Sequence, residues 1–316
     1  MRVLITGVSG FAGRHLAAVC AAEGAEVHGL VRPGGSPAPE GVRAHAAGIS
    51  DAAEVAAVLA AADPDLVFHL AGAASVGRSF GDPMGTWEAN LTGTLSVLEA
   101  LRALDDPPRC VVVTSGEIYG RVPVEDLPVD AMTPLNPLSP YGASKGAADL
   151  AAAQYRAGYG LPVIRVRAFN HIGPGQDDRF VVPNVARQIA AAELEGRSEL
   201  TVKVGNVSTR RDFTDVRDVA EAYWLLGTAG DPDVVYQACS GRSRAVRELV
   251  DTLASLARID ARISSDAALR REGEQPDLYG SPAALEALGW TPSRPVEQSL
   301  SDALDWWRAE LAKKER

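Results

Sequence analysis

The sequence predicts an α/β fold in which a doubly wound parallel sheet is followed by a smaller C-terminal part. Short apolar runs at residues 3–6, 26–31, 65–71, 109–114 and 161–168 alternate with helical patterns at 11–23, 51–62, 86–104 and 141–159. The runs contain few polar positions, as in strands covered on both faces. Because strand–helix alternation brings crossover connections, we expect these strands to lie parallel in one sheet.

Composition excludes several classes of function. The formal charge of −10 argues against a nucleic-acid partner, because phosphate binding needs concentrated Lys and Arg. Cys20, Cys110 and Cys239 are far apart without a CxxC pair, so neither a disulfide framework nor a metal site is expected. The N-terminus does not have the layout of a signal peptide, and no apolar run has the length of a membrane span. We therefore expect a cytoplasmic protein without a membrane partner.

A glycine-rich turn lies between the first strand and the first helix. Its sequence, GVSGFAG at residues 7–13, has the spacing GxxGxxG. Glycines at these positions allow a tight turn, close approach of a pyrophosphate and close helix–strand packing, while the amides of the helix start face the anion. The turn therefore predicts a Rossmann dinucleotide site, and its expected cofactor contacts are Gly7, Gly10, Phe11, Ala12 and Gly13.

The end of the second strand bears on which dinucleotide is bound. In such folds an acidic residue there binds the adenosine ribose, whereas this strand ends in Leu30-Val31-Arg32. Arg32 favours a 2′-phosphate, which predicts NADPH, or tolerance of both NADPH and NADH. The alternative interpretation of Arg32 is a solvated arginine of a surface loop.

The second half of the chain has a looser pattern, with helical segments at residues 183–194, 245–257 and 299–311. We expect residues 1–170 to form the dinucleotide-binding Rossmann domain. Residues 171–316 are expected to form mainly the substrate-binding part, partly interleaved with the last strands of the sheet.

Three residue types that are suited to carbonyl chemistry follow the fourth strand. Tyr141 and Lys145, in SPYGASK, are four residues apart and so share one face of a helix. The lysine ammonium is expected to lower the pKa of the phenol, which could then donate a proton to an alkoxide. Ser115, at the strand end, would hydrogen-bond the same oxygen and orient it. The alternative is a surface tyrosine and lysine with a turn serine.

These motifs carry a family resemblance. The segments GVSGFAG, HLAGAASVG, TSGEIYG and SPYGASK resemble the extended short-chain dehydrogenase/reductase family of the NAD-dependent epimerase/dehydratase type. The resemblance implies the Ser, Tyr and Lys roles given above and a homodimer formed through helices like those that hold Thr86 and Tyr141. It also implies further cofactor contacts, namely Leu70, Ala71, Ala73, Tyr141, Lys145, Phe169 and His171.

The second half is similar to GDP-4-dehydro-6-deoxymannose reductases, on the segments FNHIGPGQ, KVGN and RDFTDVRD. Those enzymes reduce the 4-keto group of a GDP-linked 6-deoxyhexose to give GDP-rhamnose. The similarity implies phosphate clamps at Arg211 and Arg271, with Arg210 as a rival to Arg211, and exposed charges as the alternative for each. The implied substrate contacts are Ser75, Glu117, Asn170, Arg211, Arg271 and Glu274.

Other activities stay open at this point. Glu117 matches the base that related GDP-mannose 4,6-dehydratases use, so it is also a candidate catalytic side chain, and by itself it does not separate dehydratase from reductase. The stretch Ile-Gly-Pro-Gly-Gln at residues 172–176 favours the reductase. A dehydratase or epimerase that keeps its cofactor bound is the second hypothesis. A non-enzymatic NAD(P) sensor is the remote third.

Overall fold

The computed structural model describes residues 1–266 and 275–314, and the predicted doubly wound parallel sheet is confirmed. The sheet has seven parallel strands in the order β10-β6-β5-β4-β1-β2-β3. The strands are β1 Arg2–Thr6, β2 Glu26–Val31, β3 Arg43–Ala46, β4 Leu66–His69, β5 Arg109–Ser115, β6 Val163–Ala168 and β10 Val235–Ala238. The order of the strands reverses between the neighbouring strands β1 and β4. Sheets of this kind bind ligands at the carboxyl ends of the strands at that point.

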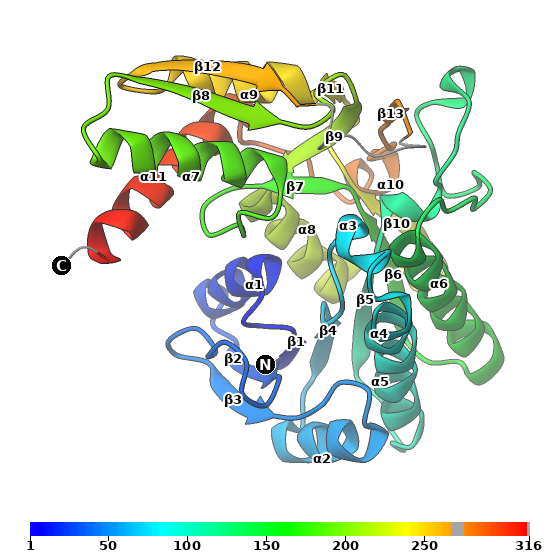
Figure 1. Cartoon of the computed structure of the whole chain (residues 1–316). Helices are drawn as coiled ribbons and strands as arrows, with labels where there is room; N and C mark the ends of the chain where they lie inside the picture. The colour runs from blue at the N-terminus through cyan, green and yellow to red at the C-terminus, as the bar shows by residue number, and fades with distance from the viewer. Residues whose placement is uncertain (267–274, 315–316) are drawn as a thin grey trace.

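Helices cover both faces of this sheet (Figure 1). One face carries α1 Phe11–Ala22, α8 Val216–Ala229 and the short α10 Ala283–Glu286, and the other carries α2 Ala52–Ala62, α5 Gly93–Arg102 and α6 Pro140–Tyr159. Alternation along β1 divides the core accordingly, because Val3 and Ile5 join the cluster under α1 and α8 while Leu4 joins the cluster under α2 and α5. The apolar strand runs of the sequence thus have helices on both sides.

Two local features depart from the sequence prediction. β3 was not expected, because it is an edge strand of polar and small residues (RAHA) that is mostly exposed. The helix expected at 86–104 is interrupted, since α4 Pro83–Trp87 is followed by a π-helical turn, Glu88–Thr92, before α5 begins. A second short helix, α3 Val76–Ser79, precedes α4.

The C-terminal half builds two further sheets. A four-stranded sheet joins β7 Asn170–Ile172, β9 Arg210–Asp215, β11 Ser243–Ala245 and β13 Asp277–Leu278, while β8 Glu199–Val204 pairs with β12 Asp260–Ser265. Their apolar residues share a core with α7 Val181–Leu194, α9 Val246–Ser255 and α11 Val296–Lys314 (Figure 1). Because α8 and β10 return from this half to the first sheet, the two halves interleave in the chain. The division at residue 170 stays a prediction.

Within residues 1–266 and 275–314, no helix is both long enough and apolar enough to cross a bilayer.

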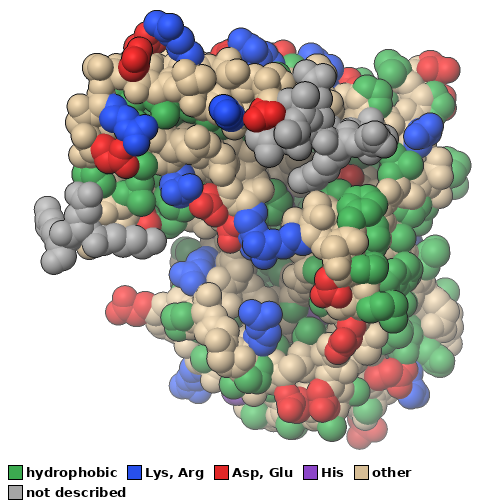
Figure 2. Space-filling view, in the orientation of Figure 1, with side chains coloured by type: hydrophobic (Ala, Val, Ile, Leu, Met, Phe, Trp, Pro, Cys, Tyr) green, Lys and Arg blue, Asp and Glu red, His purple; other side chains and the backbone are tan. Residues whose placement is uncertain are grey.

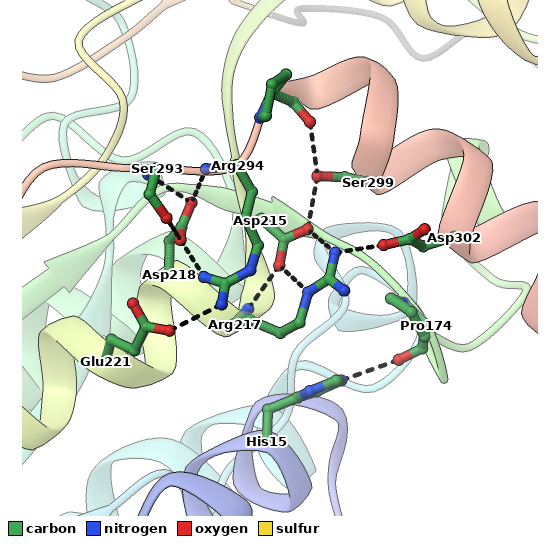
Figure 3. A network of polar contacts seen from close by, with 11 residues as sticks. His15, Pro174, Asp215, Arg217, Asp218, Glu221, Ser293, Arg294, Ser299 and Asp302 are labelled. Atoms are coloured by element: carbon green, nitrogen blue, oxygen red, sulfur yellow. Dashed lines mark hydrogen bonds and ion pairs between the residues drawn. The ribbon is translucent and has the colours of Figure 1, made fainter.

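A polar network joins α8 to α11 (Figure 3). Asp215, which is buried, caps α8 by accepting from the Arg217 amide and binds the Arg217 guanidinium at 2.7 Å. Arg217 also binds Asp302 at 2.7 Å, and Ser299 donates to Asp215 at 2.6 Å. Hydrogen bonds from Arg217 and Ser299 lower the pKa of Asp215 against the opposing effect of burial. The start of α8 and the C-terminal helix are therefore fixed to each other by charge-assisted bonds.

We predict that Asp218→Ala lowers the free energy of unfolding by about 2–4 kcal/mol. The buried Asp218 carboxylate accepts from the Ser293 amide and hydroxyl at 3.1 and 3.0 Å, and it pairs with Arg294 (Figure 3). Removing it leaves the part-buried donors of Ser293 and Arg294 without their acceptor. Urea unfolding measures the change. The matched control is Glu221→Ala, which removes the other, largely exposed partner of Arg294 and should cost less than about 1 kcal/mol. Equal losses in both variants would contradict the assignment.

Candidate active site

A cleft of about 1820 Å³ lies along the carboxyl ends of the strands of the first sheet, opposite the C-terminal half. Figure 2 shows the hollow between the two halves, with Lys and Arg side chains at its rim. Arg271 and Glu274 are outside the described residues. The other residues predicted for the site, except the rival Arg210, line the cleft: Gly7, Gly10, Phe11, Ala12, Gly13, Arg32, Leu70, Ala71, Ala73, Ser75, Ser115, Glu117, Tyr141, Lys145, Phe169, Asn170, His171 and Arg211.

The glycine turn has the geometry that close approach of a phosphate requires. Gly7 has φ +72°, and a Cβ there would lie 2.9 Å from the backbone of Ala71. A Cβ at Gly13 would lie 2.3 Å from the Gly7 carbonyl oxygen, so α1 packs against the turn only because the side chain is missing. Gly10 is the N-cap of α1 and provides no side-chain cap. The first amides of α1 are therefore available to an anion in the cleft.

The end of β2, where the sequence predicts the adenosine, lines the cleft. Arg32 is exposed there and lines the cleft, as the NADPH prediction requires. Gly48, which has no side chain to bind a base, donates its amide to Glu54 at 2.5 Å. The described residues at this end thus present a cation rather than a carboxylate at the strand end.

The predicted Ser and Tyr meet at the carboxyl end of β5. Ser139 caps α6 by accepting from the Gly142 amide at 3.0 Å, and Pro140 occupies the first turn, so Tyr141 lies at the start of the helix. The Tyr141 phenol and the Ser115 hydroxyl are close enough for Ser115 to influence the pKa of the phenol, and Ser115 Oγ accepts from the Glu117 amide at 3.2 Å. The two hydroxyl groups therefore converge on one point of the cleft.

Burial governs the protonation of this pair of α6 residues. It raises the pKa of Tyr141 to about 12, with the Ser115 hydrogen bond opposing and the negative charge of Glu117 adding to the effect. Burial also lowers the pKa of Lys145 to about 8. Lys145 donates to the Val113 carbonyl at 3.0 Å. The expected lowering of the phenol pKa by Lys145 is therefore wrong for the protein alone, because desolvation of the phenolate dominates.

Sequence reasoning missed Asn90, which supports α6 from the π-helical turn. Asn90 is buried and donates to Ser144 Oγ at 2.9 Å, and Ser144 donates to the Tyr141 carbonyl at 2.9 Å. A Cβ at Gly72 would lie 2.5 Å from Asn90 Oδ1 and 3.4 Å from Lys145 Nζ, so the amide oxygen faces the lysine side of the cleft. The only signal for it in the sequence is one asparagine inside an otherwise helical segment.

A buried ion pair fixes the same face of α6 to the sheet. Asp149, fully buried, follows Lys145 by four residues and binds Arg167 of β6 at 2.8 Å. It also accepts from Thr114 of β5 at 3.2 Å, next to Ser115. Because one carboxylate bonds both strands, the start of α6 keeps a fixed distance from the end of β5.

The structure distinguishes the candidate phosphate clamp Arg211 from its rival Arg210. Arg211 lines the cleft with Nε 3.9 Å from Glu117, and it donates to the carbonyl of Gln275 at 2.8 Å. Arg210 points to the other side of β9, where it donates to Ser243 at 2.9 Å. Alternation along the strand decides between them, and Arg211 is the arginine that reaches the cleft.

The remaining predicted residues take different positions in the cleft. Asn170 is exposed on β7, and Ser75 caps α3 by accepting from the Arg78 amide at 3.3 Å. His171 stacks on Phe11 with ring centroids 5.7 Å apart, and its Nδ1 donates to the Phe169 carbonyl at 3.1 Å. Burial lowers the pKa of His171.

Phe169 contributes less to the cleft surface than expected. Its ring is buried, with a Cβ at Gly116 falling 2.9 Å and one at Gly280 falling 2.6 Å from ring atoms. Gly116, in the segment TSGEIYG, is therefore needed because a side chain there would collide with the Phe169 ring between β5 and the C-terminal half.

Comparison with known proteins assigns the family. The model of the family described as GDP-mannose 4,6 dehydratase matches residues 4–303. The chain belongs to this family. It is 37% identical to the GDP-6-deoxy-D-mannose reductase of Pseudomonas aeruginosa over 98% of each chain. It is 30% identical to the GDP-mannose 4,6 dehydratase 1 of Arabidopsis thaliana, over 99% of this chain and 91% of that protein.

Solved structures of similar fold agree with the family assignment. RMD from Pseudomonas aeruginosa complexed with NADPH has a TM-score of 0.84 and 35% identity, and the match covers 98% of this chain and 100% of that one. The UDP-glucose 4-epimerase of Thermus thermophilus, in complex with NAD, has a TM-score of 0.87 and 31% identity over 98% and 99%. The predicted resemblance to short-chain epimerases and dehydratases is confirmed.

We predict that Gly13→Ala weakens dinucleotide binding at least roughly tenfold and lowers stability by about 1–3 kcal/mol. The added methyl group must displace α1 from the Gly7 carbonyl oxygen. Fluorescence titration with NADPH measures the affinity. Gly81→Ala, outside the cleft, is the matched control, because its Cβ would meet only the Arg78 carbonyl oxygen at 3.6 Å. Unchanged binding in Gly13→Ala would remove the phosphate-binding role of the turn.

Proposed function

We propose that this protein catalyses the NAD(P)H-dependent reduction of the 4-keto group of GDP-4-dehydro-6-deoxy-D-mannose to GDP-D-rhamnose. The chain is an NAD(P)-dependent nucleotide-sugar oxidoreductase, as its relatives over nearly the whole length are. The observation that carries the proposal is the placement of Ser115 and Tyr141 together in the cleft that begins at the glycine turn.

Tyr141 is the proton donor of the proposed reaction. When bound, the nicotinamide supplies a hydride to the carbonyl carbon. Ser115 orients the carbonyl oxygen, and Tyr141 gives it a proton as negative charge develops there. A pKa near 12 keeps the phenol protonated at neutral pH, which is the form that a reduction needs at its start. Lys145 follows Tyr141 on the same helix face, and its positive charge favours the phenolate that forms as the proton leaves.

The cleft offers local positive charge to a nucleotide although the molecule is acidic. Six cationic side chains line it, against four carboxylates: Arg14, Arg32, Lys145, Arg179, Lys203 and Arg211, against Glu88, Glu117, Asp177 and Glu310. We assign Arg32 to the adenosine phosphate of NADPH, and Arg211 with Asn170 to the diphosphate of the sugar nucleotide. A fork-shaped guanidinium suits phosphate oxygens. The roles proposed for Arg271 and Glu274 concern residues outside the described ranges.

A dehydratase is the second candidate, and Glu117 favours it. The carboxylate lines the cleft within 3.9 Å of Arg211, where it could accept a proton from a sugar carbon. A dehydratase begins by oxidising the sugar, which requires a deprotonated Tyr141. Because burial keeps that phenol protonated, the protein alone is better prepared for reduction.

Two parallel incubations, one with the keto sugar and one with GDP-mannose, test the proposal and separate the two candidates. The protein is mixed with GDP-4-keto-6-deoxymannose and with NADPH or NADH, and the sugar product is identified. The reductase oxidises one cofactor per sugar and gives GDP-rhamnose. Turnover of GDP-mannose without net cofactor consumption would instead establish the dehydratase.

Tyr141→Phe should lower kcat by roughly 10²–10⁴-fold and change the Kd of the cofactor by less than about threefold. The substitution removes the proton donor and leaves the aromatic ring in place. Steady-state kinetics and cofactor titration measure the two quantities. Normal turnover in the variant would refute the role of this phenol.

The pH profile should reflect Lys145. Its ammonium is charged below a pKa of about 8 and neutral above it, while Tyr141 stays protonated to about pH 12. We therefore expect kcat/KM to be level up to about pH 7, to be about halved near pH 8 and to fall about tenfold per unit above that. Lys145→Arg, which keeps the charge, should move the fall upward. A level wild-type profile to pH 10 would contradict this role.

We further propose a cytoplasmic homodimer formed through the surface of α4, α5 and α6. Hydrophobic side chains gather on that side of the molecule (Figure 2), and Leu150, Tyr159 and Met84 are 60%, 54% and 76% exposed. Such a patch is typical of interfaces. Leu150→Asp should shift the protein to monomers in analytical ultracentrifugation, whereas Leu194→Asp, on α7, should not. A monomeric wild type would disprove the dimer.

A further inference from the structure

One buried tyrosine hydroxyl in the core lacks a hydrogen-bond partner among the described residues. Tyr223 of α8 is 0% exposed, and its phenol oxygen has no hydrogen-bond partner among the described residues. The other deeply buried tyrosines are paired, since Tyr119 donates to the Asp130 carbonyl at 2.8 Å and Tyr236 accepts from the Asp231 amide at 2.9 Å. Buried tyrosine hydroxyls normally find a partner, because an unpaired one has lost its hydration without compensation.

Tyr223 reaches the cleft from the face of the sheet opposite to α6. It packs in the core cluster under α1 and α8, together with Val113 and Leu70, and all three residues line the cleft. Its phenol interacts electrostatically with that of Tyr141, so the two hydroxyl groups lie near the same end of the cleft. Arg32 and Gly48 mark the other end, at β2 and the start of α2.

The helix that carries Tyr223 is fixed at both ends. Asp215 caps its start, and Arg109 of β5 donates to the Gly227 carbonyl at 2.9 Å and to that of Gly230 at its end. A Cβ at Gly227 would lie 2.7 Å from Leu66 and Phe68, so α8 packs closely on the sheet. The hydroxyl is thus presented by a helix with little freedom to move away.

We propose that the Tyr223 hydroxyl is a hydrogen-bond partner of the nicotinamide half of the bound dinucleotide. The inference rests on the cofactor use in the proposed function and adds a contact from α8 to those of α6. A nicotinamide riboside carries a carboxamide and ribose hydroxyl groups, and both kinds of group pair with a phenol. Filling the cleft would give the buried oxygen the partner that the protein does not supply.

Tyr223→Phe tests the contact by separating stability from affinity. Because the hydroxyl is unpaired in the protein alone, the variant should have an unchanged or higher Tm without ligand. Its Kd for NADPH, from fluorescence titration, should rise roughly three- to tenfold. The Kd for 2′,5′-ADP, which lacks the nicotinamide half, should stay unchanged.

Tyr236→Phe is the matched control. It removes a hydroxyl of the same core that is paired with the Asp231 amide. It should lower the Tm and leave both dissociation constants unchanged. Tyr223→Phe should therefore lose affinity for NADPH without losing stability, whereas Tyr236→Phe should lose stability without losing affinity.

The outcomes distinguish this inference from the proposed function. An unchanged NADPH affinity in Tyr223→Phe, or an equal loss for 2′,5′-ADP, would overturn the contact while leaving the reductase activity untouched. Tight NADPH binding with the expected loss in Tyr223→Phe, but no reduction of the keto sugar, would support the contact and overturn the reductase. Failure of the wild type to bind NADPH or NADH would overturn both.

Discussion

The hydrogen bonds of one buried carboxylate, that of Asp149, position the part of the cleft that holds Tyr141, Lys145 and Ser115. Asp149 joins α6 to β5 through Thr114 and to β6 through Arg167. Tyr141 and Lys145 precede it by two turns and one turn of the same helix face. Breaking one side of such a buried pair typically costs about 3–5 kcal/mol, so the distance between the helix and the strand ends is well determined. The encounter of Tyr141 with Ser115 depends on that distance.

Around this fixed point, burial sets the chemistry more than charge does. Desolvation raises the pKa of Tyr141 and lowers that of Lys145, so the phenol keeps its proton while the amine is close to losing one. The two pKa values shift in opposite directions because burial favours the neutral form of each group. That form is the protonated one for tyrosine and the deprotonated one for lysine. A proton donor that is stable at neutral pH, next to a cation whose charge varies near pH 8, is a suitable arrangement for reduction.

Local patterns predicted the parts of the site that local geometry determines. The glycines of the turn and the spacing of Tyr141 and Lys145 depend on neighbours only a few residues away, so the sequence alone indicated them. Tyr223 and Asn90 could not be found in this way, because their contacts come from residues far along the chain. The choice between Arg210 and Arg211 needed the pairing of β9, which sets the face that each side chain takes. The pKa of Tyr141 was misjudged because its burial depends on the assembled cleft.

The return of α8 and β10 to the first sheet has a consequence for how the protein could be divided. α8 covers Val3, Ile5 and Phe68 on one face, and β10 pairs with β6 at the sheet edge. A fragment that ends near residue 170 would expose this apolar face and an open strand edge, both of which favour aggregation. The dinucleotide-binding half is therefore not a module that could be transplanted by a single cut. Its boundary with the C-terminal half does not fall at one position in the sequence, because the chain passes between the two halves more than once.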